Sequence, residues 1–155
     1  MSYYLQQEFD FVERTKKILE QYDKIDFSKN KNEKYEVTLL LNCFVGLLIL
    51  PKEHWFVNLP TSLIEEKEWG ISPSHIKIIE GDVKSVKEVA RHFRNSVAHY
   101  RFEVFSNEKG KISSIKFEDF LDKNTKTFEA EIPIENIKLF LNKFSSWFLE
   151  NMKKS

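Results

Sequence analysis

The sequence predicts a mainly α-helical fold, in which a bundle of four to five helices carries a small antiparallel β hairpin or meander before its last helix. Apolar residues recur at helical spacing in four long segments. Polar and apolar residues alternate, as they do in strands, in three short segments between residues 101 and 132. With 155 residues, 41% of them hydrophobic, the chain is expected to form a single domain over residues 1–155.

The first two helices are expected over residues 7–22 and 33–50. The second is apolar nearly all round after Val37, which is typical of the most buried helix of a bundle. Pro51 is expected to end it, since proline interrupts the helical hydrogen-bond pattern. This apolar run is too short to cross a bilayer, so no association with a membrane is expected.

The region between residues 51 and 81 is rich in proline and glycine, which indicates a long connection. Short helical turns are expected at residues 61–66 and 74–80. Aromatic side chains are expected to attach this connection to the body of the protein: Trp55, Phe56 and Trp69.

A third helix is predicted over residues 82–100, with Asp82 as its N-cap. After it the period changes to two, and a turn is expected at residues 107–110. Pro133 suits the first turn of the last helix. The alternating segments that predict the strands are residues 101–105, 112–117 and 127–132.

The charge pattern excludes a strongly basic protein, because 24 Lys and Arg residues balance 24 Asp and Glu residues. An anion site must therefore be local, and residues 83–101 contain five basic residues against one acidic residue. The single Cys43 cannot form an internal disulfide, and no Cys/His cluster has zinc spacing, so neither metal nor cofactor is expected. The N-terminal residues lack a secretory pattern, so a cytoplasmic location is expected.

The predicted third helix has two different faces. Its apolar face needs no explanation beyond a place in the core. The opposite face carries cationic, imidazole and amide groups that a core does not require. These are Lys87, Arg91, His92, Arg94, Asn95 and His99.

Three of these side chains suit the cleavage of a phosphodiester without a metal. His99 can take and give a proton near neutral pH. Asn95 is four residues earlier, so on a helix it could hold the imidazole in one tautomer. The planar fork of Arg94 suits a phosphoryl group, whose charge it would stabilise. The predicted reaction is attack by an RNA 2′-hydroxyl on the adjacent phosphorus.

The helical geometry also predicts a homodimer. Arg94 and His99 lie roughly 140° apart around a helix axis, so they converge poorly on one small target. A two-fold partner could place a second copy of the polar face opposite the first. We therefore expect a groove at the interface, with catalytic groups from both chains.

The segment from Arg94 to His99 resembles the R-N-x-x-x-H form of the R-x(4–6)-H signature of HEPN domains. These are helical bundles of prokaryotic toxin–antitoxin, phage-defence and RNA-processing systems. The wider string FRNSVAHYRF and the buried run LLLNCFVGLL followed by Pro51 look similar to plasmid-borne HEPN subfamilies. The resemblance implies a dimeric, metal-independent endoribonuclease in which Arg94 and His99 are catalytic and Asn95 supports them. An antitoxin protein is a further candidate partner.

Other roles remain open for the same residues. Arg91, Lys87, Arg101 and His92 are the candidates for binding RNA, although His92 could also be an ordinary surface residue. His99 could simply cap the helix at its negative pole. The alternatives to an enzyme are a non-catalytic module that binds RNA or a nucleotide, and a structural dimer. In a structural dimer the polar face would form hydrogen bonds between the subunits. Within one chain, Arg94 could instead pair with a glutamate, and Asn95 could bond to a buried backbone group in the loop after Pro51.

Overall fold

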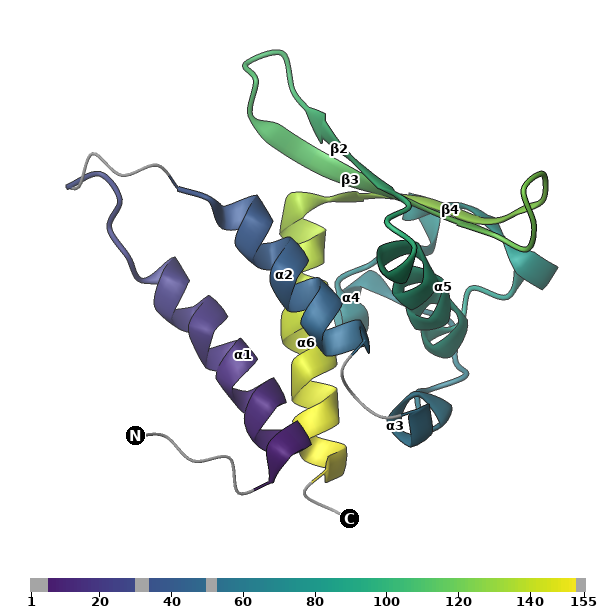
Figure 1. The fold of residues 1–155 in the computed structure, drawn as a ribbon, viewed down its shortest axis with the longest axis horizontal. Helices are drawn as coiled ribbons and strands as arrows, with labels where there is room; N and C mark the ends of the chain where they lie inside the picture. The colour runs from purple at the N-terminus through teal and green to yellow at the C-terminus, as the bar shows by residue number, and fades with distance from the viewer. Residues whose placement is uncertain (1–5, 30–33, 50–52, 153–155) are drawn as a thin grey trace.

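The computed structural model describes residues 6–29, 34–49 and 53–152, which form six α-helices, two short 3₁₀ helices and four strands. Three long helices lie side by side, and a sheet covers α5 at one end of the molecule (Figure 1). The helices are α1 Gln7–Asp23, α2 Glu36–Ile49, α3 Glu53–Val57, α4 Glu66–Trp69, α5 Val86–Ala98 and α6 Ile134–Met152. The strands are β1 Ile76–Ile79, β2 Phe102–Ser106, β3 Ile112–Phe120 and β4 Lys126–Pro133, and the 3₁₀ helices are η1 Pro73–His75 and η2 Glu80–Asp82.

The sheet makes this an α+β fold, so the prediction of a mainly helical bundle with a small hairpin is wrong. All four strands are antiparallel and follow the order β1-β4-β3-β2. The three predicted strands are present, but β1 forms where a helical turn was expected. Its Ile76 and Ile79 pair with Ala130 and Phe128 of β4, so a strand far along the chain supplies the hydrogen bonds that favour extended backbone.

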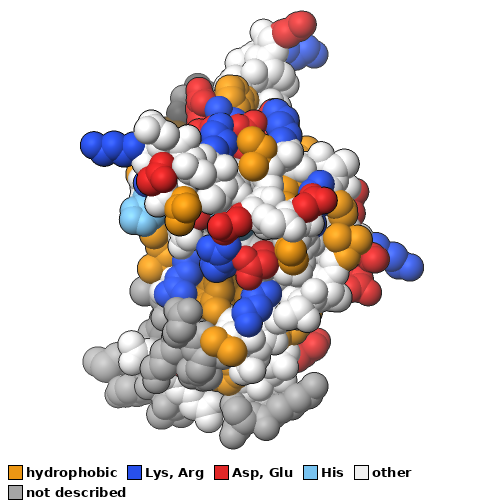
Figure 2. Space-filling model, turned by 90° about the vertical axis from the view of Figure 1, so that its right-hand side faces the viewer, with side chains coloured by type: hydrophobic (Ala, Val, Ile, Leu, Met, Phe, Trp, Pro, Cys, Tyr) orange, Lys and Arg blue, Asp and Glu red, His pale blue; other side chains and the backbone are white. Residues whose placement is uncertain are grey.

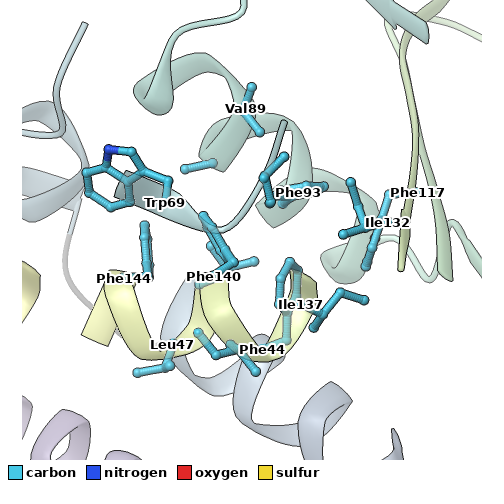
Figure 3. Close-up of a cluster of buried hydrophobic side chains, with 14 of the residues drawn as sticks. Phe44, Leu47, Trp69, Val89, Phe93, Phe117, Ile132, Ile137, Phe140 and Phe144 are labelled. Carbon is cyan, nitrogen blue, oxygen red and sulfur yellow. The ribbon is translucent and has the colours of Figure 1, made fainter. Parts of the chain in front are cut away.

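The core is aromatic and centres on Phe93 of α5, between the long helices and the sheet (Figure 3). The ring of Phe93 lies 5.3 Å from that of Phe44 on α2 and 5.7 Å from that of Phe140 on α6. From the sheet, the rings of Phe117 and Phe128 approach Phe93 to 5.0 and 5.5 Å. Edge-to-face contacts of this kind add to the stabilisation from burial. Helix α5 is thus fixed from both sides.

The long helices lie close to their predicted positions. Helix α2 is indeed strongly buried and ends at Ile49, whereas Pro51 lies outside the described residues. The last helix buries an apolar stripe, which includes Ile137, Phe140 and Phe144. No helix in residues 6–29, 34–49 and 53–152 is both long and apolar enough to cross a membrane.

The connection before α5 is attached to the body by its aromatic residues, as predicted. Phe56 and Trp69 are buried, and the indole Nε1 of Trp55 donates to Glu8 on α1. The helical turn lies at Glu66–Trp69 rather than at residues 61–66. It ends at Gly70, whose φ of 78° lets the chain turn tightly against α6.

Candidate active site on helix α5

Helix α5 begins later than predicted, at Val86. Ser85 is its N-cap, and the Ser85 hydroxyl accepts a hydrogen bond from the Glu88 N–H at 3.2 Å. Asp82 instead lies in η2 with a positive φ of 56°. The predicted apolar face is confirmed, because all its members are buried: Val86, Val89, Ala90, Phe93 and Val97.

The helix ends at Ala98, so His99 is its C-cap and not a helical residue. The next residue, Tyr100, turns the chain out of the helix with a φ of 55°. The Arg101 N–H then donates to the Ser96 carbonyl at 2.7 Å, and the Tyr100 N–H donates to Val97 at 3.2 Å. This pair of bonds is a Schellman motif. It leaves the side chain of His99 exposed at the end of the helix.

Arg94 occupies the last full turn of the helix and is half-buried. Its guanidinium carbon lies 4.9 Å from the centre of the Phe56 ring on α3. A cation over an aromatic face is stabilised by the ring quadrupole. Phe56 therefore restricts the conformations of this arginine.

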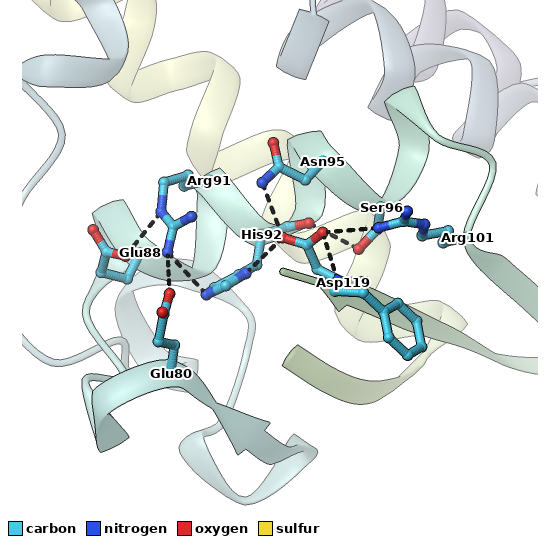
Figure 4. A network of polar contacts seen from close by, with 9 residues as sticks. Glu80, Glu88, Arg91, His92, Asn95, Ser96, Arg101 and Asp119 are labelled. Atoms are coloured by element: carbon cyan, nitrogen blue, oxygen red, sulfur yellow. Dashed lines mark hydrogen bonds and ion pairs between the residues drawn. The ribbon is translucent and has the colours of Figure 1, made fainter. Parts of the chain in front are cut away.

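Within the part of the chain that the structure describes, the side chain of Asn95 bonds to the sheet and not to the loop after Pro51, where the structural alternative placed its partner. Its Nδ2 donates to Oδ2 of Asp119 on β3 at 2.9 Å. An ionised carboxylate can only accept, so the amide nitrogen must face Asp119. The carbonyl oxygen of Asn95 consequently points away from Asp119 (Figure 4).

His92 is buried and has no exposed surface, so its expected place on a solvent-facing strip is wrong. Its Nδ1 lies 2.9 Å from Asp119 Oδ2, and its Nε2 lies 3.1 Å from Arg91 Nη2 (Figure 4). Because an arginine can only donate, Nε2 must accept, and Nδ1–H therefore donates a hydrogen bond to the Asp119 carboxylate. The imidazole is neutral in this arrangement. Burial lowers the pKa of His92, and its hydrogen bond to Asp119 offsets this only in part.

Asp119 is 4% exposed and accepts hydrogen bonds from residues of both the helix and the sheet. Its Oδ1 accepts a hydrogen bond from the backbone N–H of Phe120 at 2.9 Å and another from Arg101 Nη1 at 3.4 Å. Burial alone would raise the pKa of Asp119, but hydrogen bonds from Asn95 and His92 outweigh it and hold the pKa below its usual range. Asp119 is therefore a carboxylate that joins β3 to the motif helix.

The predicted RNA-binding cations lie near the motif but have protein partners. Arg91 pairs with Glu88 at 2.8 Å and with Glu80 at 3.5 Å. The Lys87 ammonium donates to the Val57 carbonyl at 3.1 Å. On the side of the molecule that carries α3 and α5, basic and acidic side chains are interspersed (Figure 2). The local excess of positive charge in the sequence is thus partly balanced by neighbouring carboxylates.

A family model described as HEPN pEK499 p136 matches residues 1–155. The chain belongs to this HEPN family. The resemblance that the segment from Arg94 to His99 indicated is therefore confirmed. Neither the curated proteins nor the solved structures contain a match to this HEPN chain.

Sequence reasoning missed Asp119 in this HEPN site, although a signal existed. Ile115, Phe117 and Asp119 alternate along β3 and are all buried. An acidic residue that continues the apolar face of a strand needs buried donors, because an unpaired buried charge is costly. The predicted strand ended at residue 117, two residues too early to show this.

The described part of the HEPN chain has no group of three or more His, Cys, Asp or Glu side chains placed to hold a metal ion. The chemistry available at the end of α5 is that of an exposed imidazole, a guanidinium and an amide. These are groups that move protons and stabilise anions.

Proposed function

We propose that this HEPN protein is a metal-independent endoribonuclease that acts in a toxin–antitoxin or phage-defence setting. The observation that carries the proposal is the placement of Arg94 and His99. Both lie in the segment that resembles the R-N-x-x-x-H signature of HEPN domains, and the exposed imidazole of His99 follows directly after the last turn of α5. A general base must reach its substrate, and His99 is the motif histidine that solvent reaches.

The reaction proceeds by transfer of a phosphoryl group within the RNA. His99 removes the proton from a ribose 2′-hydroxyl, and the resulting oxygen attacks the adjacent phosphorus. The O2′–P bond forms while the P–O5′ bond breaks, and an imidazolium protonates the leaving 5′-oxygen. Arg94 stabilises the charge on the phosphoryl oxygens. The products are a 2′,3′-cyclic phosphate end and a 5′-hydroxyl end.

The site is completed by a second copy of the chain. Acid and base must act on opposite sides of the phosphorus, and one protomer presents a single exposed motif histidine. A two-fold axis near the end of α5 would supply a second His99 and a second Arg94. The carbonyl oxygen of Asn95, which faces away from Asp119, would accept a hydrogen bond from an imidazole N–H and so hold one tautomer.

The RNA backbone would lie along the cations beside the motif. Arg91, Lys87 and Arg101 are close to it in sequence, and an RNA phosphate would compete with their present partners, Glu88 among them. His92 has no such role in this proposal, because it is buried.

The test is incubation of the pure protein with single-stranded RNA in EDTA. We expect cleavage that gives 2′,3′-cyclic phosphate ends and is blocked by a 2′-deoxyribose at the cleaved position. Arg94→Ala and His99→Ala should each reduce the rate at least about 100-fold while the protein stays folded. Arg14→Ala on α1 is the control, and it should cleave at the wild-type rate.

Other outcomes would support other functions. Binding that weakens steeply with salt, without cleavage, would indicate a non-catalytic RNA-binding module. A dimer that neither binds nor cleaves RNA, and that dissociates in Asn95→Ala, would indicate a structural role. An absolute requirement for Mg²⁺ would contradict the mechanism.

A further inference from the structure

Tyr100 has a backbone conformation that tyrosine rarely adopts. It occupies the C′ position of the Schellman motif after α5, with a φ of 55°. Glycine is the usual residue there, because a Cβ atom in the left-handed region lies too close to the backbone. The Schellman motif thus carries a bulky side chain at a position where its backbone conformation favours glycine.

Burial does not compensate for this conformation. Tyr100 is 80% exposed, the most of any large hydrophobic residue described. Its ring leans against Phe102 of β2, with centroids 4.8 Å apart and ring planes at 58°. Phe102 in turn packs towards the buried Phe117. The contact fixes the direction of the Tyr100 ring while most of its surface stays open to solvent.

We propose that Tyr100 is a stacking platform for an unpaired nucleobase of single-stranded RNA. The inference rests on the proposed function and names its substrate class. An exposed aromatic ring binds any base through its flat face, so it favours unpaired RNA without requiring a sequence. Tyr100 directly follows His99, so a base held on this ring brings its own ribose and phosphate beside the imidazole.

The next residue adds a backbone contact to this platform. Arg101 is only partly exposed, and its Nη1 lies 3.4 Å from Asp119, which is a long contact. The remaining donors of its guanidinium fork can meet a phosphate. Tyr100 and Arg101 would together hold one nucleotide, by its base and by its phosphate.

The test separates binding from cleavage by using a 2′-O-methylated single-stranded RNA, which cannot attack its own phosphate. Tyr100→Gly should weaken binding about tenfold, since the stacked base is lost. The same variant should melt about 2–4 °C higher than the wild type, because glycine is unstrained at this position. Tyr100→Phe keeps the ring and should bind within about twofold of the wild type.

Two controls isolate the base from the backbone. An oligomer in which the nucleotides are abasic should bind the wild type and Tyr100→Gly equally. Tyr35→Ala, which removes an exposed tyrosine just before α2, should leave RNA binding unchanged.

The outcomes distinguish this inference from the proposed function. His99-dependent cleavage together with undiminished binding by Tyr100→Gly would overturn the stacking role and leave the nuclease standing. Tyr100-dependent binding without cleavage would overturn the nuclease and support the platform. Failure of the wild type to bind single-stranded RNA at all would overturn both.

Discussion

His92 and Asp119 form a buried pair, with Nδ1 of the imidazole 2.9 Å from Oδ2 of the carboxylate. The two residues come from α5 and β3, and both are almost completely shielded from water. The imidazole also stacks on Phe128, with ring centroids 4.9 Å apart and nearly parallel planes. The same oxygen of Asp119 accepts from Asn95, so the sheet determines how a motif residue is oriented.

Replacement of Asp119 by asparagine should destabilise the protein. Both carboxylate oxygens of Asp119 accept hydrogen bonds, but an amide has only one oxygen that can accept, so at least one buried donor would lose its partner. We expect the free energy of unfolding to fall by about 2–3 kcal/mol, measured by urea denaturation. Glu103→Gln on β2 is the matched control, since Glu103 is exposed and pairs only with Lys116 among the contacts described. That change should stay within about 0.5 kcal/mol. Equal stability of the two variants would show that the buried pair contributes little.

The stability should depend on pH through His92. Its pKa is lowered in the folded protein by burial, so below the unfolded value of about 6.5 the unfolded chain binds a proton that the folded chain does not. Through this group, the free energy of unfolding should therefore not change above that pH and should fall as the pH drops below about 6.5. His92→Gln should be less stable overall but should lack most of this slope. A slope retained in His92→Gln would assign it to another group.

Two glycines that both have a positive φ angle allow the cost of steric crowding to be separated from the cost of backbone strain. Gly70 and Gly110 have φ values of 78° and 74°. A Cβ at Gly70 would lie 2.5 Å from the Cβ of Leu139, whereas one at Gly110 would meet nothing within 4 Å. We expect Gly110→Ala to cost about 1 kcal/mol and Gly70→Ala about 3 kcal/mol or more in thermal or urea unfolding. Similar losses at the two positions would mean that α6 moves to accommodate the added methyl group.

Mixing of active and inactive chains should test whether the proposed site is shared between chains. The proposed site takes its acid and its base from the His99 residues of the two chains, so a heterodimer of wild-type and His99→Ala chains has no complete site. Random pairing of equal amounts should then leave about a quarter of the wild-type rate in the RNA cleavage assay, because only a quarter of the dimers carry both His99 side chains. A rate of about one half, with heterodimers demonstrated by differential tagging, would place a complete site within each protomer.

Much of the fold could be predicted because its signals are local. Helical periodicity located α1, α2 and α6 to within a few residues, and alternation located three strands. The apolar face of α5 was also predictable, since five apolar residues, all of them buried, repeat at helical spacing. The end of α5 was predicted two residues late, because Tyr100 gives no signal of the left-handed turn that glycine would have shown.

The remaining features depend on parts of the chain that are distant in sequence. The segment Ile76–Ile79 is too short to show a period in its sequence. It becomes a strand because it pairs with the edge of the sheet formed by β4. On a helical wheel His92 lies on the polar face, which predicts a surface residue. In the structure the sheet covers that side of α5 and buries His92. Its partner Asp119 is 27 residues away. The motif residues were thus identifiable, whereas the groups that hold them were not.

The position of α5 between the sheet and the long helices has a practical consequence for protein engineering. Excision of the β2–β4 segment to obtain a minimal bundle would uncover Phe93 and leave His92 and Asn95 without Asp119. The helices on their own are therefore a poor scaffold for grafting this motif. Any shortened version should retain the strands, and a fused reporter is better inserted at the open turn around Gly110.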